Sequence, residues 1–203
     1  WDAVLEDPTV WCILGERVEA LGDPAVRASD LESLREAVPA ALATLSTTLA
    51  LRAAARGLVD DAVQLTQIAR YWDRAIPSAG QASPLALATE DVRRGLRDHC
   101  ALSLRAATDA PLEAARTART LVDQVRPDLN ALSLLLDRKD PLWVERLDEL
   151  ANLLLHCALT YEDATADVEE ARALASMAVR CAASPSVQEY ASSVGSSLAS
   201  TPR

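Results

Sequence analysis

HCALSL at positions 99–104 and HCALTY at positions 156–161 begin with the same four residues, although the chain contains only two histidines and four cysteines. The flanking sequences also match when residues 84–124 are aligned without a gap on residues 141–181. The alignment places Pro84 on Pro141, Leu96 on Leu153 and Ala118 on Ala175. Because expected helix starts and turns align together with these identities, we interpret the two segments as copies of one helical hairpin.

The composition favours helices throughout. Half of the 203 residues are hydrophobic, and the chain has no Phe, six Gly and many Ala and Leu residues. Ala and Leu have high helix propensity, whereas the β-branched and aromatic residues that favour strands are sparse. We therefore expect an all-α fold of stacked antiparallel helical hairpins, either an α-solenoid or a compact helical-repeat bundle.

Proline and glycine mark the expected boundaries. Asp7-Pro8 begins a helix that ends before Gly22, Pro39 should kink or divide the following helix, and Pro127 should end a later one. The stretch 76–84 is rich in Pro, Gly and Ser, which is typical of a linker. We accordingly expect N-terminal helices in 1–39, a first hairpin in 40–76, a linker in 77–83, a second hairpin with a short helix in 84–139, a third hairpin in 140–183, and a C-terminal helix with a frayed tail in 184–203.

The first hairpin has a pattern of small residues. Leu49 and Ala50 precede the turn at Gly57, and Ala62 and Ala69 follow it seven residues apart. This pattern resembles the tetratricopeptide repeat, although that repeat is about 34 residues long and the period here is longer. The resemblance implies hairpins that stack through alanines, so that each hairpin covers surface that its neighbour cannot bury alone.

The N-terminal region carries a second resemblance. Its sequence reads DPTVWCILGERVEALGDP at 7–24 and LREAVPAALATL at 34–45. This is similar to the helical region that accompanies J-domains in some actinobacterial proteins, which implies a chaperone-linked adaptor. The His-Pro-Asp signature of a J-domain does not occur in the 203 residues.

The charge balance indicates which partners to expect. Thirty acidic and 20 basic residues give a net charge of −10, which opposes binding to nucleic acid and to anionic membranes. We find neither a run of eighteen apolar residues nor a secretory signal pattern. We expect a protein partner or another domain of the same chain, with a homo-oligomer also possible.

The spacing of the cysteines and the scarcity of lysine suggest the cellular compartment and the type of organism. Cys12, Cys100, Cys157 and Cys181 are widely spaced, which fits the reducing cytoplasm, and we expect each to be a small core residue. Lys139 is the only lysine, a bias typical of GC-rich bacterial genes. Because the chain begins with Trp rather than Met, we expect it to be part of a longer or processed protein.

The repeated His-Cys pairs do not predict a metal site. Neighbouring side chains on a helix point about 100° apart, so His99 and Cys100 are poorly placed to bind one ion, and the same holds for His156 and Cys157. We also find no third group that would orient a Cys-His nucleophile. The sequence therefore predicts neither metal nor cofactor, and we expect no enzymatic activity.

One spacing suggests an alternative. Arg94 and His99 form Arg-x₄-His, which resembles the ribonuclease motif of HEPN proteins. The resemblance implies that His99 would transfer protons and Arg94 would hold the phosphodiester oxygens. A HEPN-like helical ribonuclease is thus an alternative to a binding module.

Acidic residues crowd the third hairpin, where Arg146 is the only basic residue between Glu145 and Glu170. Such a run is usually a solvated helix face, but it also suits a basic partner. Two tryptophans near helix ends are possible anchors. The candidates for partner binding are Glu145, Asp148, Glu149, Glu162, Asp163, Asp167, Glu169, Glu170, Trp72 and Trp143. The preferred hypothesis is a non-catalytic interaction or scaffold module, and a purely structural oligomerisation or linker domain is the other alternative.

Overall fold

The computed structural model describes residues 7–21, 30–76 and 83–200. Helices account for most of these residues and no strand occurs among them, which confirms the all-α prediction. The helices are α2 (Pro8–Leu21), α3 (Asp30–Ala55), α4 (Val59–Arg74), α5 (Pro84–Asp109), α6 (Ala114–Leu135), α7 (Pro141–Thr165), α8 (Val168–Cys181) and α9 (Pro185–Ser200), and a short 3₁₀ turn, η1 (Pro111–Glu113), precedes α6.

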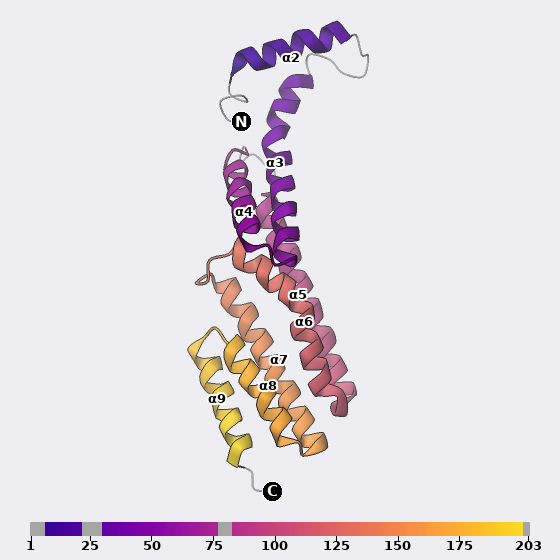
Figure 1. Cartoon of the computed structure of the whole chain (residues 1–203), viewed down its shortest axis with the longest axis vertical. Coiled ribbons are helices and arrows are strands. Elements are labelled where there is room, and N and C mark those ends of the chain that lie inside the picture. Colours follow the sequence, from indigo (N-terminus) through magenta and orange to yellow (C-terminus); the bar gives the residue numbers. More distant parts are fainter. Residues whose placement is uncertain (1–6, 22–29, 77–82, 201–203) are drawn as a thin grey trace.

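The helices form an elongated stack (Figure 1). The α3–α4 hairpin lies towards the N-terminal end, α5–α6 follows, and α7–α8 lies beyond it. Helix α7 packs against both helices of the preceding hairpin, and α9 packs against α8 and α7. The chain therefore advances along the stack from one hairpin to the next.

Capping residues explain why α5 and α7 begin where they do. The Ser83 hydroxyl accepts a hydrogen bond from the Ala86 backbone N–H at 3.1 Å, and the Asp140 carboxylate accepts one from the Leu142 N–H at 2.8 Å. Each cap is followed by proline at the first helical position, which needs no hydrogen-bond partner for its nitrogen. The aligned segments 84–124 and 141–181 thus start with the same local chemistry.

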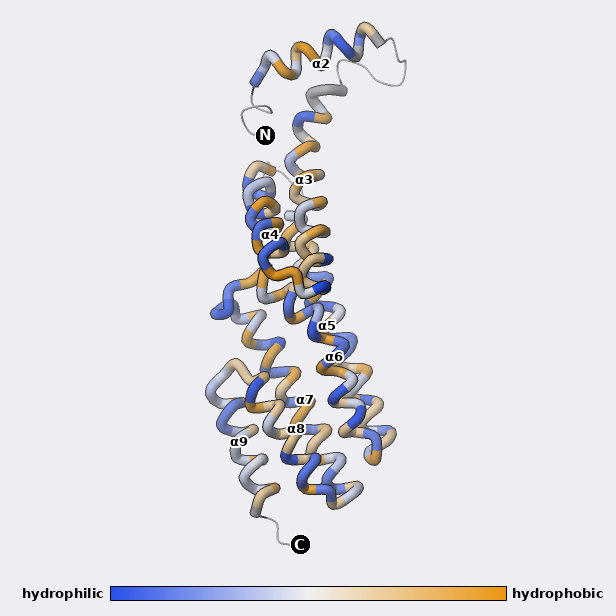
Figure 2. The backbone as a smooth tube through the Cα atoms, viewed as in Figure 1, coloured by the Kyte–Doolittle hydropathy of each residue, from blue (hydrophilic) through white to orange (hydrophobic). Residues whose placement is uncertain are grey.

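Small residues bring the paired helices together. Ala118 and Ala175, which the sequence alignment equates, are both fully buried, as are the larger Leu121, Leu154 and Leu174. Figure 2 shows hydrophobic segments alternating with hydrophilic ones along each helix, as expected for helices with one buried face. The core therefore combines alanine contacts between neighbouring helices with leucines that fill the remaining space.

The predicted helix end before Pro127 is wrong, and α3 is not divided at Pro39. Helix α3 continues through Pro39 and α6 continues through Pro127. Consequently the boundary that we expected between 39 and 40 lies inside one helix, and the short helix expected after Pro127 belongs to α6. A proline inside a helix costs about 3 kcal/mol. Burial of Val125 and Leu132 on both sides of Pro127 offsets this cost in α6.

The turn at Gly57 and most of the cysteines are as expected, whereas Cys12 is not. Gly57 has a φ of 75°, so the α3–α4 turn uses the left-handed conformation that glycine favours. Cys100 and Cys157 are buried as expected and Cys181 is half-buried, but Cys12 is exposed, because α2 packs only lightly on α3. The linker residues 77–82 and the terminal residues 201–203 lie outside the described residues.

Helix α3 is more apolar than we expected. Its segment Ser33–Ala55 is the one helix among the described residues that is long and apolar enough to cross a membrane, and 33% of its most apolar window is buried in the chain. A core helix of a water-soluble protein passes the same test, so length and composition alone do not assign a membrane role. The sequence nevertheless contains no run of eighteen apolar residues, because this helix reaches its high mean hydropathy while including Ser, Thr and charged side chains.

Candidate functional site

An open groove lies between α5 and α7 and has a volume of about 870 Å³. Helix α5 contributes Arg97 and a strip of small and apolar side chains, and α7 contributes mainly polar ones. The lining residues are Arg97, Cys100, Ala101, Leu104, Glu145, Arg146, Asp148, Glu149, Asn152, Leu153 and His156. The groove therefore has an apolar floor and polar walls that come from two successive hairpins.

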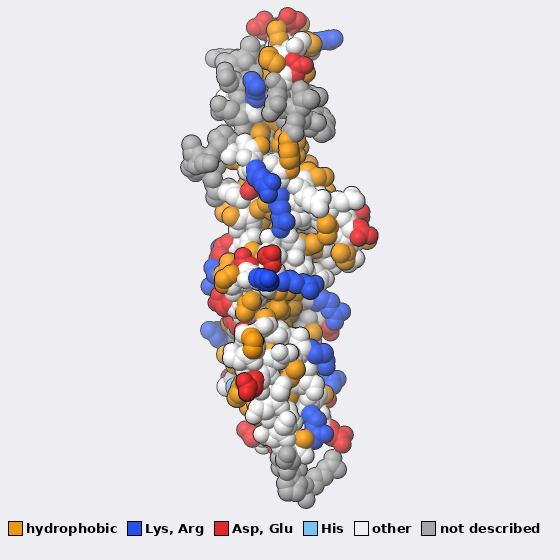
Figure 3. All heavy atoms as spheres, turned by 90° about the vertical axis from the view of Figure 1, so that its left-hand side faces the viewer, with side chains coloured by type: hydrophobic (Ala, Val, Ile, Leu, Met, Phe, Trp, Pro, Cys, Tyr) orange, Lys and Arg blue, Asp and Glu red, His pale blue; other side chains and the backbone are white. Residues whose placement is uncertain are grey.

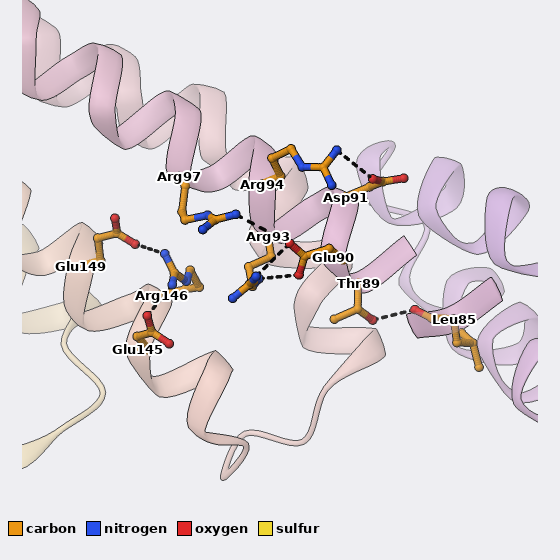
Figure 4. A network of polar contacts seen from close by, with 10 residues as sticks. All are labelled: Leu85, Thr89, Glu90, Asp91, Arg93, Arg94, Arg97, Glu145, Arg146 and Glu149. Carbon is orange, nitrogen blue, oxygen red and sulfur yellow. Dashed lines mark hydrogen bonds and ion pairs between the residues drawn. The ribbon is translucent and has the colours of Figure 1, made fainter. Parts of the chain in front are cut away.

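The two walls carry opposite charges. Helix α5 lines the groove with Arg97, which lies one turn after Arg93, and α7 lines it with Glu145 and Glu149, one turn apart. Figure 4 shows Arg97 of α5 on the side of Arg146 and Glu149 of α7, whereas Arg94 points away from α7 to Asp91. A segment lying in the groove would thus meet positive charge along one edge and negative charge along the other.

The buried Arg146 side chain connects the two glutamates of the acidic wall. Its side chain is only 6% exposed, and its two terminal nitrogens donate to Glu149 and Glu145 (Figure 4). The remaining guanidinium nitrogen, Nε, is buried and has no hydrogen-bond partner. A buried cation needs compensating anions, so both glutamates are held in place by Arg146 as well as by their own helix.

The basic wall has its own ion pairs. Arg93 Nε donates to Glu90 Oε2 at 2.7 Å, and Arg97 approaches the other oxygen of Glu90 at 3.6 Å. The hydrogen bond from Arg93 lowers the pKa of Glu90 below its usual 4.5. The same hydrogen bond to Glu90 raises the pKa of Arg93, with a smaller contribution from the negative charge of Glu145. Both arginines therefore pair with a glutamate of their own helix α5.

Asp148 links the groove to the C-terminal helix. Its carboxylate accepts hydrogen bonds from the backbone N–H groups of Ala183 and Ser184 at 2.8 and 3.0 Å, just before α9 begins. Burial alone would raise the pKa of Asp148, but these hydrogen bonds outweigh that effect and lower it below 3.8. Asp148 thus fixes the start of α9 and is less available than its neighbours for a partner.

Cys100 lines the groove and Cys157 lies in the core, and both thiols are buried. Burial raises the pKa of Cys100 to about 11, with a further contribution from the negative charge of Glu149. Burial also raises the pKa of Cys157 to about 11. A thiol with such a pKa is almost entirely protonated near neutral pH and is a poor nucleophile.

Arg94 and His99 point to different neighbours. Five residues on a helix correspond to a rotation of about 140°, so the two side chains leave α5 in different directions. Arg94 lies 3.7 Å from Asp91 on the solvent side of α5, whereas His99 is half-buried and acts on Asp128 of α6. Burial raises the pKa of Asp128, and His99 partly offsets this. The structure does not bring Arg94 and His99 together within one copy of the chain.

The other acidic candidates are dispersed. Asp167 caps α8 by accepting a hydrogen bond from the Glu170 N–H at 3.2 Å, and the Glu170 side chain pairs with Arg119 at 2.6 Å. Glu169 is exposed in the first turn of α8, while Glu162 and Asp163 lie in the last turn of α7. In Figure 3, acidic and basic side chains are interspersed along one face of the molecule and do not gather into a single patch. Of the eight acidic candidates, only Glu145, Asp148 and Glu149 line the groove.

Neither tryptophan candidate is well exposed. Trp72 is 7% exposed and meets the exposed ring of Tyr71 edge-to-face, with the ring centroids 5.2 Å apart. Trp143 is half-buried against the main core. Both side chains therefore stabilise the fold at the ends of their helices.

Sequence reasoning missed the residues that form the floor of the groove and the buried arginine that connects its two glutamates. Ala101 and Leu104 line the groove on α5, and Arg146 was seen only as the exception in an acidic run. The available signal was the position of Arg146 on an otherwise apolar helix face, with glutamates one and three residues away. A charge at such a position is either exposed or paired, and here it is paired.

Two negative findings complete the description of the site. Within residues 7–21, 30–76 and 83–200, no group of three or more His, Cys, Asp or Glu side chains is arranged to hold a metal ion. Comparisons of the chain with protein-family models, with curated proteins and with solved structures find no match. The functional assignment therefore depends on the geometry of the groove.

Proposed function

We propose that this chain is a non-catalytic protein-interaction module that holds a segment of a partner protein, or of another domain of its own chain, in the α5–α7 groove. The observation that carries the proposal is an open groove of about 870 Å³ with an apolar floor and oppositely charged walls. The apolar floor would supply binding energy, and the two walls would select the orientation of the bound segment.

The acidic side chains of the groove are held in place by other residues of the chain, so a partner could bind without reordering them. Arg146 holds Glu145 and Glu149, and Asp148 is anchored to the start of α9. A site whose side chains are already fixed loses little conformational entropy when a partner binds. This property suits a scaffold that presents a rigid surface.

The stacked arrangement also supports an interaction module of the tetratricopeptide-like kind. The expected small residues Ala50, Ala62 and Ala69 are buried in the first hairpin, and Ala171 and Ala178 are buried in the third. Consecutive hairpins contact one another in chain order. A stack of this kind leaves a long surface on which a partner segment lies across more than one hairpin.

Selection from a displayed peptide library tests the proposal. The chain is used as bait, and the variants Ala101→Arg and Leu104→Arg place bulky charges on the groove floor. Leu102→Arg is the matched control, because Leu102 is exposed on the same helix and does not line the groove. We expect enriched peptides to bind the unaltered chain and the control and to lose binding to both groove variants. Peptides that bind all four proteins equally, or no enrichment at all, would contradict the proposal.

The ribonuclease alternative has a direct test. We expect the chain not to cleave single-stranded or structured RNA, because Arg94 and His99 face different neighbours in one copy. Cleavage by the unaltered chain that disappears in His99→Ala would favour the HEPN-like function instead. The chaperone link, the cytoplasmic location and the bacterial origin remain predictions from the sequence.

A further inference from the structure

The groove between α5 and α7 has one charged end and one end without charged side chains. On α5, Arg97 comes first, and Ala101 and Leu104 follow on the same side of the helix. On α7 the charged lining residues occupy positions 145–149, and the later lining positions hold no Arg, Asp or Glu. Figure 4 places Arg97 on the side of Arg146 and Glu149, so the charged ends of the two helices meet.

The two arginines of the groove are already paired within the chain. Both terminal nitrogens of Arg146 donate to glutamates of α7, and the Arg146 side chain is only 6% exposed. Arg97 lies 3.6 Å from Glu90, a carboxylate of its own helix. A segment that enters the groove therefore meets positive charges that already have anions beside them.

The acidic wall, in contrast, keeps acceptor oxygens that the chain does not use. Arg146 donates to Oε1 of Glu145 and to Oε2 of Glu149. Within the part of the chain that the structure describes, no hydrogen bond reaches the other oxygen of either glutamate. The two side chains are 57% and 39% exposed, so a group in the groove can reach them. Because one arginine compensates only one of the two carboxylates, this wall retains negative charge.

The negative charge is also felt at the floor of the groove. Burial is the main cause of the raised pKa of Cys100, and the charge of Glu149 raises that pKa further by more than Arg146 lowers it. The charge of Glu149 is thus not cancelled at the floor by the arginine that it binds. A cation placed over Cys100 would be attracted.

The buried arginine distinguishes this wall from an ordinary solvated helix face. Arg146 lines the groove, and its Nε is buried without a hydrogen-bond partner. A buried polar group without a partner lowers the stability of the fold, and such local conflicts are typical of functional sites. Its effect here is to hold Glu145 and Glu149 beside the apolar floor.

We propose that the groove recognises a segment of a partner protein that carries a lysine or arginine within four residues of a large apolar side chain. The inference rests on the proposed function of the groove and names the chemistry of its occupant. The basic side chain donates to the free oxygens of Glu145 and Glu149, and the apolar side chain covers Ala101 and Leu104. Arg97 and Leu104 are seven residues apart, which is about 10 Å along α5, so two nearby side chains of one segment span both ends.

An acidic segment suits the groove less well. It would have to compete with Glu90 for Arg97, and Glu145 and Glu149 would repel it. The net charge of the chain, −10, also favours the approach of a basic segment over an acidic one.

The displayed peptide library provides the first test. Peptides that bind the unaltered chain and lose binding to Leu104→Arg should be enriched in a basic residue within four positions of Leu, Ile, Met, Phe or Trp. Groove-dependent peptides without this enrichment would overturn the inference and leave the proposed function standing. If no peptide depends on Leu104, both the inference and the proposed function fail.

Fluorescence anisotropy with the most enriched groove-dependent peptide provides the second test, and it needs no change to the protein. Replacing the basic residue of the peptide with glutamine should weaken binding about 3- to 10-fold. Raising the NaCl concentration from 50 to 500 mM should weaken the original peptide more than the glutamine peptide, because salt screens the ion pairs. Equal affinity and equal salt dependence of the two peptides would overturn the inference.

Single substitutions in the protein locate the contact. Glu145→Gln and Glu149→Gln each leave Arg146 one charged partner, and each should weaken the original peptide about 3-fold without affecting the glutamine peptide. Glu189→Gln is the control, because Glu189 is exposed on α9 and does not line the groove. If the two groove variants weaken both peptides equally, the glutamates act only through the fold, and the inference is wrong.

Discussion

For the buried ion cluster around Arg146, we expect that removing the two anions destabilises the chain more than removing the cation. Removing the charges of both partners, in Glu145→Gln with Glu149→Gln, leaves the buried guanidinium uncompensated. Each hydrogen bond keeps its charged donor but loses its charged acceptor, a loss of about 1 kcal/mol per bond. With the added cost of an unpaired buried charge, we expect the double variant to lose about 3 kcal/mol of unfolding free energy. Glu145 is the more exposed partner and should account for the smaller share.

Removing the cation instead should cost much less. Arg146→Met keeps an unbranched apolar side chain against the core, removes the unpartnered Nε and leaves two carboxylates that water already reaches. We expect a loss of about 1 kcal/mol or less, because the desolvation cost of the guanidinium disappears together with its hydrogen bonds. The triple variant, with all three charges removed, should therefore be more stable than the double variant by about 2 kcal/mol.

Urea unfolding followed by far-UV circular dichroism measures these differences. All four proteins are compared at one pH, and the urea dependence of the free energy shows whether they unfold by the same two-state transition. An Arg146→Met variant less stable than the Glu145→Gln, Glu149→Gln double variant would refute the reasoning. So would a triple variant no more stable than the double variant, since the cost would then not come from an uncompensated charge.

Three further sets of substitutions probe the helices and their contacts. Gly195→Ala should stabilise the chain by about 1 kcal/mol, because alanine favours the helix and its Cβ would lie 3.8 Å from the Cβ of Ala175, an ordinary contact distance. Gly57→Ala should instead destabilise the chain by about 1 kcal/mol, because the φ of residue 57 is positive. Ala175→Leu should cost about 1–3 kcal/mol by overpacking a fully buried position, and Ala173→Leu on the exposed side of α8 should be nearly neutral. Asp148→Asn should destabilise the chain near neutral pH. The pKa of Asp148 is lower in the folded chain than its usual 3.8, so its ionised carboxylate stabilises the fold above about pH 3.8. This contribution is lost as the pH falls through the folded pKa. Thermal and urea unfolding check all three, and a stability difference for Asp148→Asn that does not shrink towards about pH 3 would contradict the last one.

Much of the helical organisation was predictable from local chemistry. The starts of α5 and α7 follow from Ser83-Pro84 and Asp140-Pro141, since a capping side chain and a proline act on adjacent residues. The turn at Gly57 was predictable for the same reason. Such features need no information about distant parts of the chain.

The groove was only partly predictable. Glu145 and Glu149 were identified as partner-binding candidates from an acidic run, but the same run also included Asp167, which caps α8, and Glu170, which pairs with Arg119. A run of like charges does not show which residues face a neighbouring hairpin. That depends on how α7 is rotated against α5, which is a property of the packed pair.

The amino-acid order by itself determined that the chain is helical, where α5 and α7 begin and which small residues face inward, because propensity, capping and periodicity act within a few residues. Tertiary packing determined the rest. Helices α3 and α6 continue through Pro39 and Pro127, and in α6 the burial of Val125 and Leu132 on both sides of the proline offsets the missing hydrogen bond. Tertiary packing also buried Arg146 at the wall of a groove, since burial arises only when separate helices meet, whereas its two glutamate partners lie on its own helix.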